Sequence, residues 1–136
     1  MLVGIDPLLR GDLLAALDQM GHGDVLVIAD ANFPARRLAD QVIDVQGVDA
    51  PRVMRAVASV FPLDDSAPIS LMASPAGRLR VQDELVLAAG GESHGPGVVE
   101  LDRFAFYEAA SEARVVLITG ELRSYGNVLL RKGVVV

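Results

Sequence analysis

The stretch Met20–Pro34, with the sequence MGHGDVLVIADANFP, is the starting point for interpreting this chain. Its centre, Val25–Ala29, is an unbroken apolar run between two polar segments that carry glycine or proline. Such a run predicts a strand that is buried on both faces, with a functional loop at each end. His22 stands at the entry of this strand and Asp30 at its exit.

The predicted strand separates these two polar side chains. Seven residues of extended chain span roughly 23 Å. His22 and Asp30 therefore meet only if the glycine turn folds the histidine back over the sheet, or if Asp30 serves a neighbouring subunit. Gly21 and Gly23 have no side chain, so they permit positive φ and leave the imidazole uncrowded. A simpler alternative is a helix that ends at a glycine beside a half-exposed histidine.

Helices alternate with apolar strands outward from this stretch. Helices are predicted at residues 7–20, 34–38, 50–61, 81–89 and 103–113, and further strands at residues 41–45, 69–73, 98–101, 115–119 and 128–130. Asp49 and Asp102 each place an acceptor side chain at a helix start. The third of these helices has an expected buried stripe of Val53, Met54, Val57, Val60 and Phe61. The alternation predicts an α/β fold, a three-layer α/β/α sandwich with a mostly parallel, mixed sheet.

Length and composition indicate one domain, residues 1–136, that buries a real core. The chain is 51% hydrophobic but only 4% aromatic, so its apolar mass is mainly Val, Leu, Ala and Ile. That is more apolar surface than a small monomer easily hides, which favours a homo-oligomer. The net charge of −6, without a cluster of Lys and Arg, argues against a nucleic-acid partner.

Several site types and compartments are excluded by what the sequence lacks. There is no cysteine, which rules out disulfides, thiolate zinc sites, iron–sulfur clusters and a cysteine nucleophile. No apolar run approaches the ~18 residues of a membrane span. No signal peptide is recognisable either, so we expect no membrane partner and a cytoplasmic protein.

One catalytic motif is matched in sequence but not in its predicted structural context. Gly91–Gly95, GESHG, fits the Gly-x-Ser-x-Gly nucleophile elbow, which requires a sharp turn between a strand and a helix. A predicted helix precedes it and Pro96-Gly97 follows, so the match is rejected. His94 is interpreted as a loop residue, the alternative being that it reaches a neighbouring subunit's site.

Cofactor and metal sites also lack their sequence signals. No phosphate-binding loop and no dinucleotide fingerprint occurs. His22, Asp24 and Asp30 do not have a spacing that specifies a metal. We therefore expect neither a cofactor nor a metal.

The remaining polar candidates suit an uncharged substrate: His22, Asp30, Arg103, Tyr107, Tyr125 and Asn127. Histidine exchanges protons near neutral pH. Arg103 and Tyr107 share a helix face, where a guanidinium can grip two vicinal hydroxyls; the alternative is a surface arginine over a tyrosine ring. Tyr125-Gly126-Asn127 lies beyond strand 115–119, where open α/β sheets bind ligands. Its alternative is an ordinary turn.

Five motifs in register resemble one known family. They are Met20–Asp24 (MGHGD), Asp30–Pro34 (DANFP), Arg103–Glu108 (RFAFYE), Ile118–Glu121 (ITGE) and Tyr125–Asn127 (YGN). Together they resemble the L-fucose mutarotase and D-ribose pyranase family, from about Gly4 to Gly133. Only residues 74–97 follow the family poorly, and their role stays open.

The resemblance implies a fold, an assembly and a set of site residues. The implied fold is an α/β/α sandwich that assembles into rings, as a decamer or octamer, with sites completed between adjacent subunits. His22 is implied as the proton donor, and Asp30, Arg103 and Tyr125-Gly126-Asn127 as the sugar-binding groups. Ribose pyranases tend to carry histidine at the position of Arg103 and alanine at that of Gly126, so the sequence resembles the fucose branch. Some fucose-type members carry histidine where Asn32 stands, which makes Asn32 a weaker candidate.

The activity implied by this resemblance is a sugar mutarotase reaction. One group protonates the ring oxygen of a free pyranose, with L-fucose as the expected sugar, while another accepts the proton of the anomeric hydroxyl. No metal, cofactor or covalent intermediate is needed for this exchange. Tyr125 or a water is the expected base. The alternatives are a D-ribose pyranase-type activity and a non-catalytic sugar-binding oligomer.

Overall fold

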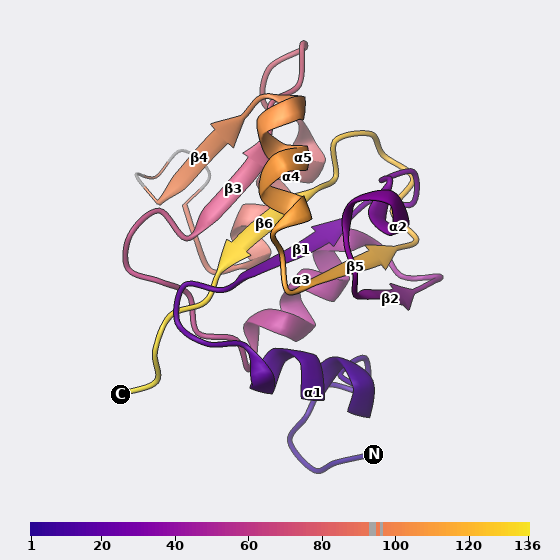
Figure 1. The fold of residues 1–136 in the computed structure, drawn as a ribbon, viewed down its shortest axis with the longest axis vertical. Coiled ribbons are helices and arrows are strands. Elements are labelled where there is room, and N and C mark those ends of the chain that lie inside the picture. The colour runs from indigo at the N-terminus through magenta and orange to yellow at the C-terminus, as the bar shows by residue number, and fades with distance from the viewer. Residues whose placement is uncertain (93–94, 96) are drawn as a thin grey trace.

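The structure is a computed structural model that describes residues 1–92, 95 and 97–136. Its helices are α1 (Gly11–Gln19), α2 (Ala35–Leu38), α3 (Ala50–Ala58), α4 (Arg80–Ala88) and α5 (Arg103–Ser111). Its strands are β1 (Val25–Ala29), β2 (Val42–Val45), β3 (Ile69–Met72), β4 (Val98–Leu101), β5 (Val115–Thr119) and β6 (Val128–Arg131). Figure 1 shows helices on both sides of a twisted sheet.

The strands form one mixed sheet in the order β2-β5-β1-β6-β3-β4. The pairs β1–β5, β2–β5 and β3–β4 are parallel, whereas β6 runs antiparallel to both of its neighbours, β1 and β3. The predicted mostly parallel, mixed sheet is therefore confirmed. Because β6 runs the other way, its first residues lie at the edge of the sheet where β1 and β3 end.

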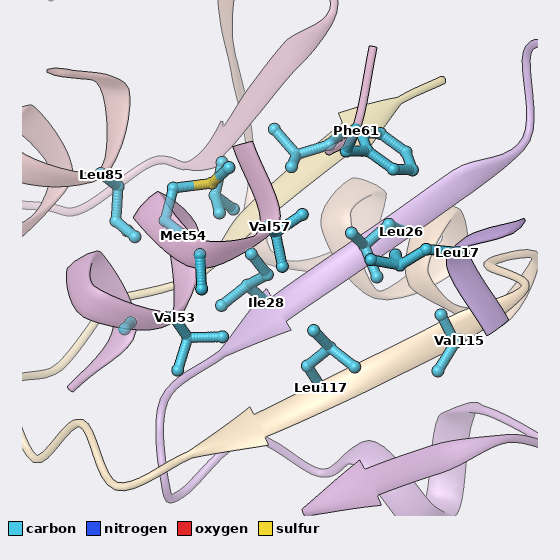
Figure 2. Close-up of a cluster of buried hydrophobic side chains, with 14 of the residues drawn as sticks. Leu17, Leu26, Ile28, Val53, Met54, Val57, Phe61, Leu85, Val115 and Leu117 are labelled. Atoms are coloured by element: carbon cyan, nitrogen blue, oxygen red, sulfur yellow. The ribbon is translucent and has the colours of Figure 1, made fainter. Parts of the chain in front are cut away.

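The central strand β1 contributes to two hydrophobic clusters, one on each face of the sheet. Leu26 and Ile28 belong to the cluster under α1, α3 and α4, part of which is drawn in Figure 2. Val27 and Ala29 belong to the cluster under α2 and α5. Since successive side chains of a strand point to opposite faces, this division confirms that Val25–Ala29 is buried on both sides. The three-layer sandwich follows from it.

Helix starts were predicted well where a local cap decides them. The Asp49 carboxylate accepts the Arg52 backbone N–H at 2.8 Å, and the Asp102 carboxylate accepts that of Ala105 at 2.9 Å. These bonds satisfy backbone donors that a helix leaves without partners in its first turn. Both predicted N-caps are confirmed.

The predicted start of the first helix was wrong, because α1 begins at Gly11 rather than after Asp6. The Asp6 side chain instead accepts the Leu8 backbone N–H at 3.0 Å within a turn and pairs with Arg52 at 2.9 Å. Val60 was also wrongly placed in the core: α3 ends at Ala58, so Val60 leaves the helical stripe and is 39% exposed. The other predicted elements agree with the observed ones to within two residues at each end. No helix in the described residues is long and apolar enough to cross a bilayer.

Candidate functional site

A pocket of about 260 Å³ opens at the edge of the sheet where β1 and β3 end and β6 begins. Its lining comes from the β1–α2 loop, the end of β3, the first turns of α5 and the loop before β6. The lining residues are Asp30, Asn32, Phe33, Pro34, Met72, Arg103, Tyr107, Ser124, Tyr125 and Asn127. The fold thus brings together all but two of the residues that the sequence nominated as a sugar site, the exceptions being His22 and Gly126.

Neither of two larger hollows combines a carboxylate, an amide side chain and a guanidinium. One of about 490 Å³ lies along the N-terminal segment and is lined mainly by apolar side chains. The other, of about 520 Å³, lies against the face of the sheet that α5 covers, with lining residues from β3, β4 and β6 and from the start of β1. There Asp24 already accepts the Gly21 backbone N–H, and Arg131 donates to the Gly23 carbonyl. The smaller pocket is therefore the better candidate site, because open α/β sheets bind ligands beyond the carboxyl ends of their strands.

Asp30 and Asn127 form a reciprocal pair at the floor of the pocket. The Asp30 backbone N–H donates to Asn127 Oδ1 at 2.8 Å, and Asn127 Nδ2 donates to Asp30 Oδ2 at 3.0 Å. The other carboxylate oxygen of Asp30 accepts the Asn32 backbone N–H at 3.0 Å. These bonds fix both the carboxylate and the amide orientation, because an inverted amide would lose both contacts. Asp30 remains only 6% exposed.

The Asp30 carboxyl has a perturbed protonation equilibrium. Burial raises the pKa of Asp30, and the negative charge of Glu121 acts in the same direction. Hydrogen bonds from Asn32, Asn127 and Phe33 oppose part of this rise, since they favour the ionised form. Asp30 therefore takes up a proton more readily than an exposed aspartate does, which suits a group that handles protons or hydroxyls.

Arg103 offers the pocket a guanidinium that the protein itself does not use. It is the first residue of α5, is exposed, and has no hydrogen-bond or ion-pair partner in the part of the chain that the structure describes. A cation at a helix N-terminus is electrostatically unfavourable, so this position does not stabilise α5. Tyr107, one turn later, lines the same pocket, which confirms the shared face. No cation–π contact joins the two side chains among the described residues, so the stacked alternative is not observed.

The Tyr125-Gly126-Asn127 segment is a turn with unusual backbone demands. Tyr125 has φ of 62°, in the left-handed region that few side chains adopt. A Cβ on Gly126 would lie 2.8 Å from Glu121 Cγ, so no larger residue fits there without a shift. Gly126 does not line the pocket; it lets Tyr125 and Asn127 do so. An ordinary turn would not explain the pairing of Asn127 with Asp30.

An ion pair between the buried Glu121 and the partly exposed Arg123, which the sequence did not reveal, supports this turn. Glu121 accepts hydrogen bonds from Arg123 Nε and Nη2, each at 2.9 Å, and from the Arg123 backbone N–H at 2.9 Å. Arg123 Nη1 also donates to Glu84 of α4 at 2.7 Å. The Arg123 hydrogen bonds lower the pKa of Glu121 despite its burial. Glu121 and Arg123 are close in sequence, but the contact that ties them to α4 was not predictable from local patterns, because Glu84 is remote in sequence.

Gln82 is a second support that sequence reasoning missed. Its side chain is fully buried, and Nε2 donates to the Met72 carbonyl at 2.7 Å and to the Tyr125 carbonyl at 3.4 Å. Its Oε1 accepts the Leu79 backbone N–H at 3.0 Å. Gln82 thereby ties α4 to two lining residues of the pocket. Phe33, Pro34, Met72 and Ser124 are further lining residues that were not nominated, and only Phe33-Pro34 fell inside a quoted motif.

His22 lies at the opposite end of β1 and does not line the pocket. Its side chain is 62% exposed, and Nε2 lies 3.7 Å from Asp64 Oδ1. The glycine turn does not fold it over the sheet; Gly23 takes φ of 84° and its N–H donates to the Lys132 carbonyl at 2.8 Å. The simpler alternative agrees with the structure: α1 ends at Gln19, just before Gly21, and His22 is exposed, although Gly21 does not adopt a positive φ. His94 lies outside the described residues.

The site and the fold agree with a family match that covers nearly the whole chain. Residues 3–135 match the family described as the RbsD / FucU transport protein family. The chain belongs to this family.

Solved structures of the RbsD / FucU type superimpose closely on the chain. Protein Atu2016, provisionally described as a sugar binding protein, is 41% identical with a TM-score of 0.88, covering 100% of this chain and 97% of that one. FucU from Bifidobacterium longum is 36% identical with a TM-score of 0.89, covering 98% and 99%. The fucose mutarotase from Streptococcus pneumoniae, solved with L-fucose, is 32% identical with a TM-score of 0.87, covering 99% and 100%. RbsD from Bacillus subtilis, at 22% identity and a TM-score of 0.77, shows the shared fold alone.

Proposed function

We propose that this protein is a sugar mutarotase that interconverts the α and β anomers of a free pyranose, with L-fucose as the first candidate. The observation that carries the proposal is the buried pair of Asp30 and Asn127, set in one pocket with the Arg103 guanidinium, which has no partner among the described residues. The similarity to FucU and to a fucose mutarotase over the full chain supports it. No nucleic acid, membrane, metal or cofactor enters this proposal.

The pocket offers the polar groups that a monosaccharide needs. A carboxylate accepts hydrogen bonds from hydroxyls, an amide both donates and accepts, and a guanidinium donates to two neighbouring oxygens at once. Asp30, Asn127 and Arg103 supply one of each. The aromatic rings of Tyr107 and Tyr125 border the same space. We assign Asp30, Arg103 and the Tyr125-Gly126-Asn127 segment to sugar binding.

Anomer exchange requires an acid and a base that act on the two oxygens bonded to the anomeric carbon. The acid protonates the ring oxygen, the base removes the proton of the anomeric hydroxyl, and the bond from C1 to the ring oxygen breaks to give the open-chain aldehyde. Rotation about C1–C2 and reclosure yield the other anomer. We assign the proton donor to His22, and the base to Asp30 or to a water or Tyr125 beside it. The raised pKa of Asp30 supports a proton-accepting role.

We also propose that a second copy of the chain completes the site, and the position of His22 supports this. Within one chain the histidine and the pocket occupy opposite ends of β1. Phe104 and Leu122, which are near lining residues in sequence, are 78% and 81% exposed. Large exposed apolar side chains beside a polar pocket are typical of a surface that another subunit covers. We propose a cyclic homo-oligomer in which His22 of each copy enters the pocket of the next.

The direct test is saturation-transfer NMR on equilibrated L-fucose. We expect exchange between the two anomeric signals to accelerate in proportion to protein concentration. Unchanged exchange with L-fucose and with a panel of other free sugars would remove the enzymatic proposal. Acceleration on D-ribose but not on L-fucose would instead indicate a ribose-type pyranase.

A non-catalytic sugar-binding oligomer is the second candidate, because Atu2016 is described only in terms of sugar binding. It predicts heat of binding by calorimetry with the same sugars and no change in anomer exchange. The two candidates are therefore separated by running both measurements on the same preparation.

A further inference from the structure

The pocket has an apolar side that the polar binding groups do not use. Met72 ends β3, and the antiparallel register of β3 with β6 pairs Leu71 with Val128. The next pair toward the pocket is therefore Met72 beside Asn127, about 4.8 Å apart across the strands. The thioether thus lies one strand away from the amide that holds Asp30.

The position of Met72 is fixed by its surroundings. Its side chain is buried in the cluster under α5, and its carbonyl accepts the hydrogen bond from the fully buried Gln82. On its other side the β3–β4 register places Leu101. A thioether is at most a weak hydrogen-bond acceptor. The Met72 side chain therefore provides almost no hydrogen bonding to a sugar hydroxyl.

Phe33 extends the same apolar surface from the β1–α2 loop. Its ring makes edge-to-face contacts with Phe106 and Tyr107, with centroids 5.9 Å and 5.6 Å apart. These contacts hold the ring in place, so it does not turn away to admit a polar substituent. Met72 and Phe33 both line the pocket that contains Asp30, Asn127 and Arg103.

We infer that Met72 determines which substituent the pocket accepts at C5 of the pyranose, favouring a methyl group over a hydroxymethyl group. This inference rests on the proposed function, and it adds a physical basis for choosing 6-deoxy sugars. The ring hydroxyls are bound by the carboxylate, the amide and the guanidinium. The substituent without hydrogen-bonding needs then faces the thioether, where an added hydroxyl would be buried without a partner.

Three sugars isolate this one position. D-arabinose, L-fucose and L-galactose have the same ring stereochemistry in their pyranose forms and differ only in bearing hydrogen, methyl or hydroxymethyl at C5. We expect catalysed exchange, as kcat/KM, to be highest for L-fucose and lower for L-galactose by on the order of 10- to 100-fold. D-arabinose should fall below L-fucose by roughly 10-fold, since it lacks one buried methyl group.

Variants at position 72 test the residue itself. Met72→Gln keeps the length of the side chain and adds an amide, so the L-fucose to L-galactose ratio should fall by at least about 10-fold. Met72→Ala, which opens space for the hydroxymethyl group, should lower the same ratio if the glutamine variant does not fold. Met72→Leu is the matched apolar control and should leave the ratio within about two- to threefold of wild type.

The outcomes separate this inference from the proposed function. Equal exchange of all three sugars by the wild type, or an unchanged ratio in active Met72→Gln and Met72→Ala variants, overturns the role of Met72 and leaves the mutarotase proposal standing. Absence of exchange with every sugar overturns the mutarotase proposal. In that case the same three sugars are titrated by calorimetry. The inference then stands only if L-fucose binds more tightly than L-galactose and Met72→Gln reduces this difference in affinity.

Discussion

Asp30 and His22, the two candidate residues that flank β1, have opposite environments. Asp30, at the carboxyl end, is buried, bonded through both carboxylate oxygens and set in a pocket. His22, before the amino end, is exposed and within the described part of the chain makes only a long contact with Asp64. A buried and fully bonded group has its geometry decided within one chain. An exposed group that the sequence predicts to be functional needs a partner, which here we propose is the pocket of another copy.

The largest loss of activity should come from substituting His22, the exposed residue. His22→Gln is expected to slow anomer exchange by on the order of 10²- to 10⁴-fold, because it removes the proton donor. The free energy of unfolding should change by less than about 0.5 kcal/mol, since the side chain is exposed and weakly paired. Exchange NMR and chemical denaturation measure the two quantities. Asp65→Asn, an exposed carboxylate with no contact to His22 among the described residues, is the control, and a comparable loss of exchange in that variant would contradict the special role of the histidine.

The guanidinium at the pocket mouth should have the next largest effect on activity. Arg103→Ala is expected to lower kcat/KM by roughly 10- to 100-fold, mainly through KM, because charge-assisted hydrogen bonds to the sugar are lost. Stability should stay level or rise by a few tenths of a kcal/mol, since a cation leaves the N-terminus of α5. Arg37→Ala, on α2 and away from the lining, is the matched control. Strong destabilisation by Arg103→Ala would show that the residue is structural.

A substitution in the Tyr125-Gly126-Asn127 turn should mainly lower the stability of the fold. Gly126→Ala is expected to lower the free energy of unfolding by about 1–3 kcal/mol, since its Cβ would crowd Glu121 and the Arg123 carbonyl. Gly11→Ala provides the opposite control: it lies in α1 with nothing within 4 Å of the added Cβ, so stability should rise by roughly 0.5–1 kcal/mol. Equal effects of the two substitutions in denaturant titrations would refute the packing argument for Gly126.

The smallest effect concerns the buried carboxyl and its pH dependence. The pKa of Asp30 is raised in the folded state, so its protonated form is favoured by folding. Its stabilising contribution is therefore present below the unfolded-state pKa and is lost as the pH rises through the folded-state pKa. Asp30→Asn removes this dependence, so the variant's stability relative to wild type should improve from acidic to neutral pH. A relative stability that declines over that interval would mean that the hydrogen bonds, not burial, dominate.

Local patterns predicted much of this fold. The apolar runs that became β1 and β5 and the caps at Asp49 and Asp102 are decided by neighbours in sequence. The start of α1 was not predictable in this way, because Asp6 is engaged by Arg52 from a remote helix. Val60 was misassigned because the periodicity of α3 does not show where that helix stops.

The candidate site was predicted less completely for the same physical reason. Asp30, Arg103, Tyr125 and Asn127 were nominated from motifs, and the fold places them around one pocket. Their supports are long-range: Gln82 bonds to Met72 and Tyr125, and Arg123 reaches Glu84 on α4. The periodicity of apolar residues does not identify a glutamine that is buried for its hydrogen bonds. The sequence also left open whether the glycine turn folds His22 back toward Asp30. The structure shows that it does not, so His22 and the pocket lie at opposite ends of β1.

The proposal that the site forms between copies is tested most directly by mixing two variants of low activity, each impaired at a different part of the site. Copies with His22→Gln and copies with Arg103→Ala are unfolded together in equal amounts, refolded into mixed oligomers and assayed for anomer exchange on L-fucose. If each site takes its histidine from one copy and its pocket from the next, about a quarter of the sites regain both groups, and exchange rises well above that of either variant alone. If the mixed oligomers exchange no faster than the average of the two variants, histidine and pocket act within one chain or not at all, and the account is wrong.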